Sequence, residues 1–239
     1  MAKKKQELKK ADEVLIDVVE VREQAGDFFE RNRLYVLGGI GLLVLVLGGW
    51  FAYNQFYKVP KQQEAVEQMF QAQIQFERDS FQLALINPGG GYLGFLDIID
   101  NYGGTPAANT AKYYAGVSYL HIGQEKNNAN KEFEAAISYL KDFDAKGDVM
   151  PIVKNGALGD AYAELKDFSQ AMSYYKKAVS SGDNQLLTPY YLKKVGMLNE
   201  KNGDAQAALN AYEQIKNEYP NSPEARDIEK YIARVTPKG

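Results

Sequence analysis

The chain has 239 residues, of which 45% are hydrophobic and 25% charged, and its formal net charge is −3. These values are typical of a folded protein and exclude disorder over most of the length, and a charge so close to balance gives no general attraction for nucleic acid. The sequence contains no cysteine, which excludes disulfide scaffolds, thiolate nucleophiles and zinc–thiolate sites.

Residues 1–33 predict a charged, partly helical leader. Two heptads of apolar residues are too few for an independently stable coiled coil. We therefore expect a short helix that docks on a partner or lies along a membrane surface, and a solvated, partly frayed leader is the alternative. The apolar residues recur at alternating spacings of four and three: Val14, Val18, Val21, Ala25 and Phe28.

Residues 34–53 predict one membrane-spanning helix. No charged residue lies between Arg33 and Lys58, and eleven of the twenty residues in the segment are Leu, Ile, Val or Phe. Twenty helical residues extend about 30 Å, the thickness of the hydrocarbon core of a bilayer. A buried core helix is the alternative, but such a helix rarely runs so far without a polar face. No small-x-small cleavage site follows the segment, so we expect an uncleaved anchor rather than a signal peptide.

The charges that flank this segment predict its orientation. Arg31 and Arg33 lie directly before it, whereas Lys58 and Lys61 follow at a greater distance. The positive-inside rule therefore favours a cytoplasmic N-terminus. The remainder of the chain would then be translocated, which in a Gram-negative bacterium means an inner-membrane anchor and a periplasmic domain.

Small residues also fall near one face of the membrane segment: Gly38, Gly41, Gly48 and Ala52. Another helix could approach closely along such a face. The alternative is that glycine is simply common in membrane helices.

After a short linker expected at 54–60, the sequence repeats itself over residues 61–235. The clearest unit runs from Leu158 to Ala178 with the spacing Leu-Gly-x2-Tyr-x8-Ala-x3-Tyr-x2-Ala. A second unit keeps the offsets around Gly196 and Tyr212 and ends at Pro220. A third starts at Gly116 and has one extra residue in the turn at 127–128. We expect each unit to be a helical hairpin whose small residues allow close helix crossing and whose aromatic residue fills the groove beside them.

A fourth, degenerate unit precedes these three. It predicts a helix over 61–86, a break at 87–91 and a second helix over 92–102. At the other end, residues 224–235 predict a capping helix with its charged residues outward. No segment has the composition of a strand, so the expected fold is all-α: a single transmembrane helix followed by an α-solenoid.

These spacings resemble the tetratricopeptide-repeat family over residues 92–235, although the leading Trp of that family is absent. The whole layout, a charged leader, one membrane helix and an extracytoplasmic repeat domain, resembles YfgM-type single-pass inner-membrane proteins. That resemblance implies an ancillary partner of the Sec translocon and of periplasmic chaperones.

The family resemblance also implies a concave face lined by the first helix of each hairpin. Its mixture of aromatic residues, Met and separated charges suits a polypeptide better than a nucleic acid or a small molecule. Met197 stands where a carboxylate-clamping repeat needs Asn, so we do not expect that specificity. Carried over from the family, the inner positions are Tyr113, Val117, His121, Val153, Asp160, Glu164, Tyr190, Lys193, Met197 and Lys201.

The sequence offers little support for catalysis, and we expect neither an enzyme nor a cofactor or metal. His121, the one histidine, is expected to cap a helix or face solvent. Residues 89–91 lack the Lys-Ser/Thr that follows a phosphate loop. Asp97 and Asp100 are expected on a solvated helix face.

The expected function is therefore a membrane-anchored interaction scaffold that binds protein partners on the extracytoplasmic side, as a translocon or chaperone adaptor. A scaffold for outer-membrane or secretion assembly is one alternative. A regulator that acts through its cytoplasmic leader is another.

Overall fold

The computed structural model describes the backbone of residues 2–126 and 129–236, and its side chains at 25, 26 and from 28 onward within that range. The described residues form helices, turns and loops without any strand, so the all-α prediction is confirmed. The chain divides into two compact units, Met1–Pro60 and Lys61–Gly239.

The first unit consists of α1 (Ala2–Tyr53) and the few residues up to Pro60. The helix is interrupted at Asn32, whose backbone departs from helical angles and whose side-chain amide donates to the carbonyl of Phe28. The segment 34–53 lies entirely in α1, and its apolar side chains are exposed except for the half-buried Val36; Leu45, for example, is 74% accessible. In the described part of the chain, one helix is long and apolar enough to cross a membrane. The side chains of Val14, Val18 and Val21 lie outside the described residues.

The segment expected as a linker, 54–60, is helical. A π-helical turn, η1 (Asn54–Lys58), follows α1 directly, and α2 (Val59–Glu77) follows the turn. The Val59 N–H donates to the carbonyl of Asn54, one residue further back than in an α-helix. Pro60 has no N–H and would clash with the carbonyl four residues before it, so the wider turn accommodates the proline without ending the helix.

The second unit begins with a layer that consists of most of α2 and two short helices, α3 (Phe81–Ile86) and α4 (Phe95–Asn101). The prediction of a single helix over 61–86 is wrong, because α2 ends at Glu77 and α3 begins at Phe81. Asp79 has a φ of +56° there, and the Ser80 N–H returns to the carbonyl of Gln75.

The helix expected over 92–102 is α4, and it starts later than expected, at Phe95 instead of Tyr92. The intervening loop is set by glycines: Gly89, Gly90 and Gly91 all have positive φ. Gly94 passes so close to the carbonyl of Leu85 that a Cβ there would lie 2.2 Å from the oxygen. Residues 87–94 therefore form the loop that reverses the chain between α3 and α4, and its glycines permit this backbone conformation.

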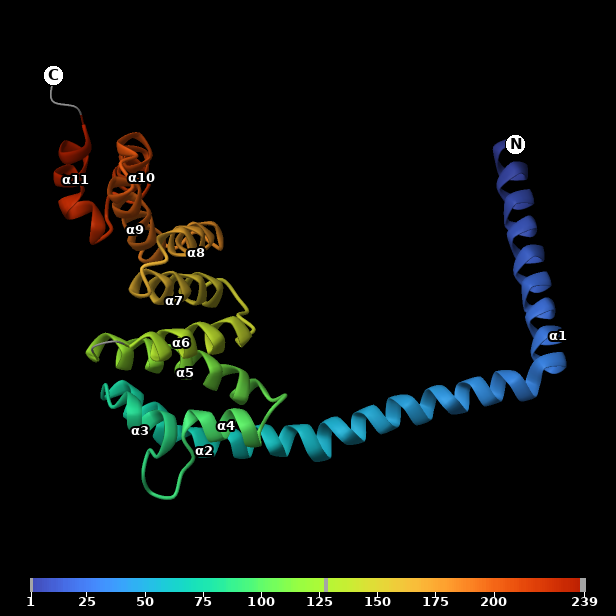
Figure 1. The fold of residues 1–239 in the computed structure, drawn as a ribbon. Helices are drawn as coiled ribbons and strands as arrows, with labels where there is room; N and C mark the ends of the chain where they lie inside the picture. The colour runs from blue at the N-terminus through green and yellow to red at the C-terminus, as the bar shows by residue number, and fades with distance from the viewer. Residues whose placement is uncertain (1, 127–128, 237–239) are drawn as a thin grey trace. The chain divides into compact units, whose positions relative to one another are not determined.

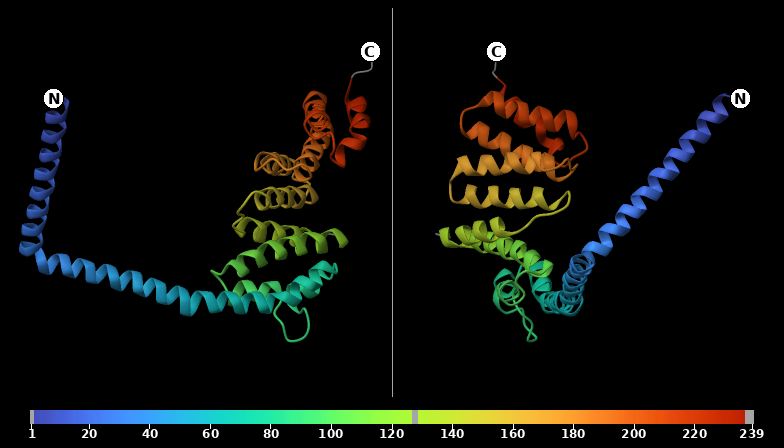
Figure 2. Two further views of the ribbon diagram at one scale, coloured as in Figure 1. Left: turned by 180° about the vertical axis from the view of Figure 1, so that it is seen from behind. Right: turned by 90° about the vertical axis from the view of Figure 1, so that its right-hand side faces the viewer.

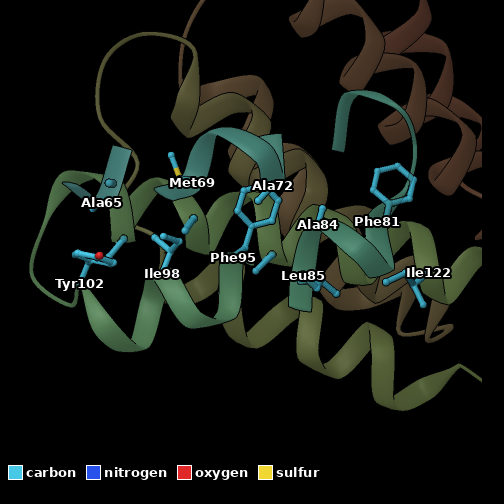
Figure 3. Packing of buried hydrophobic residues seen from close by; sticks show 14 residues of the cluster. Ala65, Met69, Ala72, Phe81, Ala84, Leu85, Phe95, Ile98, Tyr102 and Ile122 are labelled. Carbon is cyan, nitrogen blue, oxygen red and sulfur yellow. The ribbon is translucent and has the colours of Figure 1, made fainter. Parts of the chain in front are cut away.

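Buried side chains hold this first layer together and join it to α5 (Pro106–Glu125) (Figure 3). Ala65, Met69 and Ala72 recur on one face of α2 and meet Phe95 and Ile98 of α4 in one cluster. The spacing of four and three puts the three α2 residues on a single stripe.

Three helical hairpins and a cap come next in the chain (Figures 1 and 2). Thr105, Asp167 and Asp204 cap the N-termini of α5, α8 and α10, each accepting from a backbone N–H three residues on. The pairs are α5 with α6 (Asn130–Asp142), α7 (Met150–Glu164) with α8 (Phe168–Ser180), and α9 (Leu187–Lys201) with α10 (Ala205–Glu218), and then come η2 (Glu224–Asp227) and α11 (Ile228–Val235).

Glycine–aromatic contacts set the close crossing within two hairpins, as the spacing predicts. A Cβ on Gly159 would lie 2.4 Å from the Tyr175 ring, and one on Gly196 would lie 2.3 Å from the Tyr212 ring. The first hairpin differs, because Phe133 lies against Gly123 near the turn, whereas Leu140 packs on Gly116. The extra residue expected at 127–128 lies outside the described residues.

The apolar core of the second unit is a series of four clusters rather than one centre. Each cluster is shared by helices that are close in sequence, and the last joins α9, α10 and α11. On α11, Ile228 and Val235 face inward. The charged residues expected to face outward are exposed: Arg226, Asp227, Glu229, Lys230 and Arg234. This nearest-neighbour construction is that of a repeat protein.

Candidate polypeptide-binding groove

The first helices of the three hairpins, α5, α7 and α9, contact one another in order and enclose a groove of about 520 Å³. Seven of the ten positions expected on the concave face line it: Tyr113, Val117, His121, Val153, Asp160, Glu164 and Tyr190.

The other three expected residues, all on α9, lie outside this groove. The Lys193 ammonium is held 4.7 Å above the ring of Tyr231, next to α11. Lys201 lies over the ring of Phe168, at the start of α8. Met197 is 47% exposed and is not among the groove-lining residues. Lys193 and Lys201 are directed instead toward aromatic rings of neighbouring helices.

Seven other residues also line the groove and were not expected there, and three of them are aromatic or charged: Tyr175, Tyr191 and Lys194. The sequence pattern explains Tyr175 by its packing on Gly159, and for that reason it did not indicate that Tyr175 also lines the groove. Lys194 stands four residues after Tyr190 and therefore on the same helix face. This spacing from Tyr190 could have placed Lys194 in the groove, whereas the family offsets selected the neighbouring residue, Lys193.

A hydrogen-bonded ion pair joins the walls of the groove. Asp160 Oδ1 accepts from the Tyr175 hydroxyl at 2.6 Å and from Lys194 Nζ at 2.5 Å. The three residues come from α7, α8 and α9. The Lys194 ammonium also lies 4.8 Å from the centre of the Tyr190 ring and 5.4 Å from that of Tyr175. Charge-assisted bonds and cation–π contacts thus fix two successive hairpins against each other.

These surroundings set the protonation states of the groove. Burial and the nearby Asp160 carboxylate raise the pKa of Tyr175 well above its ordinary value, and the same two causes raise the pKa of Tyr191. Burial alone would lower the pKa of Lys194, but its interaction with Asp160 outweighs burial and the net shift is upward. At neutral pH both tyrosines therefore keep their protons, Tyr175 donates its own to Asp160, and Lys194 keeps its charge.

The floor of the groove depends on a glycine. A Cβ on Gly156 would lie 1.9 Å from Cζ of Tyr191, so the Tyr191 ring rests directly on the backbone of α7. Any larger residue would push α9 away from α7. This contact brings Asp160 and Lys194 within bonding distance across the two helices.

One end of the groove is bounded by α3. The His121 ring stacks on Phe81 with centroids 4.5 Å apart and planes 4° apart, so this exposed histidine has an aromatic partner that the sequence did not reveal. Beside it, the Gln124 amide donates to Glu164 at 3.0 Å. The layer of α2, α3 and α4 packs on another face of α5, at Ala108, Ala111 and Ala115. Tyr113 and Val117 lie on the face of α5 that lines the groove.

A second cavity, of about 680 Å³, is lined by the loop before α5 and by the loop between α6 and α7. Its polar groups pair with each other: Asn109 exchanges two hydrogen bonds with the backbone of Asp144, and Lys112 pairs with Asp142. Among the residues that the structure describes, no three His, Asp or Glu side chains are grouped so as to hold a metal ion.

The small residues of the segment 34–53 lie on an open surface. A Cβ added to Gly38, Gly41 or Gly48 would meet no atom within 4 Å, and Ala52 is exposed. The packing of another helix on this face stays a prediction.

The last hairpin matches a known repeat family. Residues 194–222 match the tetratricopeptide repeat. This match covers about half of α9, all of α10 and the turn after it, and it confirms the predicted repeat type for this hairpin. Tetratricopeptide repeats imply protein partners, and hence a protein–protein interaction scaffold.

Two relatives extend the comparison. Over 94 residues the chain is 29% identical to the photosystem I assembly protein Ycf3 of Prochlorococcus marinus strain NATL1A, and 28% identical to the same protein of strain NATL2A. Each match covers 39% of this chain and 44% of the relative. The chain thus spans less than half the length of these relatives.

Proposed function

We propose that this protein is a membrane-anchored, non-catalytic scaffold that binds polypeptide segments in the groove between α5, α7 and α9. The observation that carries the proposal is the groove itself. It is open, lined by tyrosines and aliphatic side chains, and held in shape by the pair of Asp160 and Lys194. A prearranged aromatic surface binds a peptide at a low entropic cost.

The membrane anchor in this proposal is the segment 34–53. Its support is an exposed apolar surface that would be costly in water, on a helix long enough to span a bilayer. The proposed topology, with the N-terminus in the cytoplasm of a bacterium and the repeats in the periplasm, follows from Arg31 and Arg33. A reporter fused after Gly239 should be active only outside the cytosol, and activity restricted to the cytosol would reverse this topology.

Site-specific photocrosslinking in native membranes tests the binding function. A photoreactive phenylalanine at Tyr113 or Tyr190 should capture polypeptides, because both side chains line the groove. The same probe at Glu134, an exposed position on α6, should capture far fewer. Equal capture at all three positions would rule out the groove as the binding surface.

Within this scaffold class, we propose a translocon or chaperone adaptor as the leading role. Its support is the layout of a charged leader, one apolar helix and a repeat domain beginning at Lys61, close after that helix in the chain. The groove crosslinks should then include the Sec channel or periplasmic chaperones and their clients. Absence of the Sec channel from all neighbours would exclude this role.

A scaffold for the assembly of a membrane complex is the second candidate. The matched relatives are named photosystem I assembly proteins, and a domain that holds subunits during assembly needs the same kind of groove. Crosslinks to subunits of one envelope complex, rather than to many clients, would favour this candidate. A third candidate, regulation through the leader, predicts that deletion of residues 1–30 abolishes the function while groove crosslinks persist.

A further inference from the structure

The charges that line the groove are not balanced. Asp160 is neutralised by Lys194, to which it is bonded. Glu164 has no cationic partner among the described residues, and its hydrogen-bond partner is the neutral amide of Gln124. With histidine counted as neutral, the groove lining therefore carries one uncompensated negative charge, located at the end next to His121.

The protein's own lysine shows which group the groove wall accommodates. The Lys194 ammonium is bonded to a carboxylate and lies over the faces of Tyr175 and Tyr190. An ammonium is attracted to the negative face of an aromatic ring, most strongly where water is partly excluded. The other groove carboxylate, Glu164, is exposed and has the same chemical preference, but no cation from the described part of the chain pairs with it.

We propose that the groove is selective for extended polypeptide segments that carry a lysine or arginine next to apolar or aromatic residues, with the basic side chain at Glu164. The apolar residues of the segment lie against Tyr113, Val117 and Val153, and the basic residue reaches the end bounded by α3. This inference rests on the proposed function, because it names the class of segment that the same groove takes.

Fluorescence anisotropy with the full chain in detergent tests this selectivity. The probes are three pools of short synthetic peptides with the same content of Ala, Val, Leu, Tyr and Pro, which differ at one central position: Lys, Gln or Glu. The Lys pool should bind more tightly than the Gln pool by roughly twofold to fivefold, the range of one exposed ion pair, and the Glu pool should bind most weakly. Added salt should reduce the difference.

Two variants locate the effect. Glu164→Gln should abolish the preference for the Lys pool, and Glu164→Lys should reverse it in favour of the Glu pool. Glu134→Lys, the same charge change on exposed α6, should leave the order unchanged. Glu164 is exposed, so these changes should not prevent folding, and circular dichroism of each variant checks this.

The inference is overturned if the Lys pool fails to bind, binds no more tightly than the Glu pool, or keeps its advantage in Glu164→Lys. Photocrosslinking at Tyr113 and Tyr190 distinguishes this failure from that of the proposed function. Groove-specific capture without charge preference would leave the scaffold intact and remove only the selectivity.

Discussion

Lys166 and Gly203 occupy the same place in successive hairpins, one residue before the aspartate that caps the second helix. Both have positive φ, +62° for Lys166 and +80° for Gly203. Glycine adopts this conformation without steric cost, whereas the Cβ of a lysine crowds the backbone there. The second hairpin therefore retains a strained residue where the third has a relaxed one.

Replacement of Lys166 by glycine should stabilise the protein by about 0.5–1 kcal/mol, because the relief of strain exceeds the added entropy of the unfolded chain. Urea unfolding followed by circular dichroism measures the change. Lys176→Gly, in the exposed interior of α8, is the control and should destabilise by about 1 kcal/mol. A loss of stability in Lys166→Gly would show that the turn is not strained.

The pair of Asp160 and Lys194 should be strongly coupled. Lys194→Met leaves a half-buried carboxylate with one remaining donor, Tyr175, and should cost about 1–2 kcal/mol. The double variant Asp160→Leu/Lys194→Met should cost less than the sum of the single changes, since neither charge is then left alone. Additive unfolding free energies in a double-mutant cycle would contradict this coupling.

At the scale of the element, two ion pairs fasten the capping helix α11: Lys216 of α10 pairs with Glu229, and Arg234 pairs with Glu200 of α9. Arg234 of α11 donates to Glu200 of α9, which also accepts from the Tyr212 hydroxyl at 3.1 Å. Hydrogen bonding by Arg234, the largest cause, and by Tyr212 lowers the pKa of Glu200 below its ordinary value of 4.5, against a smaller opposing effect of burial. The folded protein therefore binds fewer protons here than the unfolded chain does.

This shift predicts a pH-dependent contribution of Glu200 to stability. Because the folded pKa is depressed, the contribution is complete above the unfolded value of about 4.5 and is lost as pH falls through the folded value. Glu200→Gln should thus be less stable than the parent at pH 7, and the difference should shrink below about pH 4.5. Urea unfolding between pH 7 and pH 3 measures it, and Glu134→Gln serves as the exposed control. A difference that stays constant with pH would refute the linkage.

The sequence predicted elements best where the same offset between a glycine and an aromatic residue recurs. Gly159 with Tyr175 and Gly196 with Tyr212 defined the second and third hairpins, because each pair reflects a close crossing that few other residues permit. The end of α2 near Asp79 was missed because neither Gly nor Pro marks it. An aspartate in a left-handed turn does not change the spacing of the apolar residues.

The groove was predictable for α5 and α7 but less so for α9. Family offsets name Tyr113, Val117 and Asp160, and these residues line the groove because they follow the period of one face of their helices. Lys194 is one residue from the position that these offsets name, and its bond to Asp160 across two hairpins depends on Tyr191 resting on Gly156. Contacts between repeats are three-dimensional and have no fixed spacing in the sequence.

At the scale of the whole molecule, the second unit should fold without the first. Each of the four apolar clusters is built from residues between Ala65 and Val235. A fragment of residues 61–236 should therefore be helical and should melt cooperatively at a temperature similar to that of the parent domain. Circular dichroism during heating measures this, with the parent chain in detergent as the reference. A fragment without a thermal transition would show that residues 1–60 are needed for folding.

The series of four clusters also determines how the repeat domain would respond to mechanical load. Each cluster is shared only by helices that are close in sequence, so no set of contacts resists extension all at once. A force applied between Lys61 and Val235 would detach terminal layers first and leave the interior hairpins paired until their neighbours had gone. The domain would thus lengthen in steps at low force and recover layer by layer, acting as a compliant link between whatever holds its two ends.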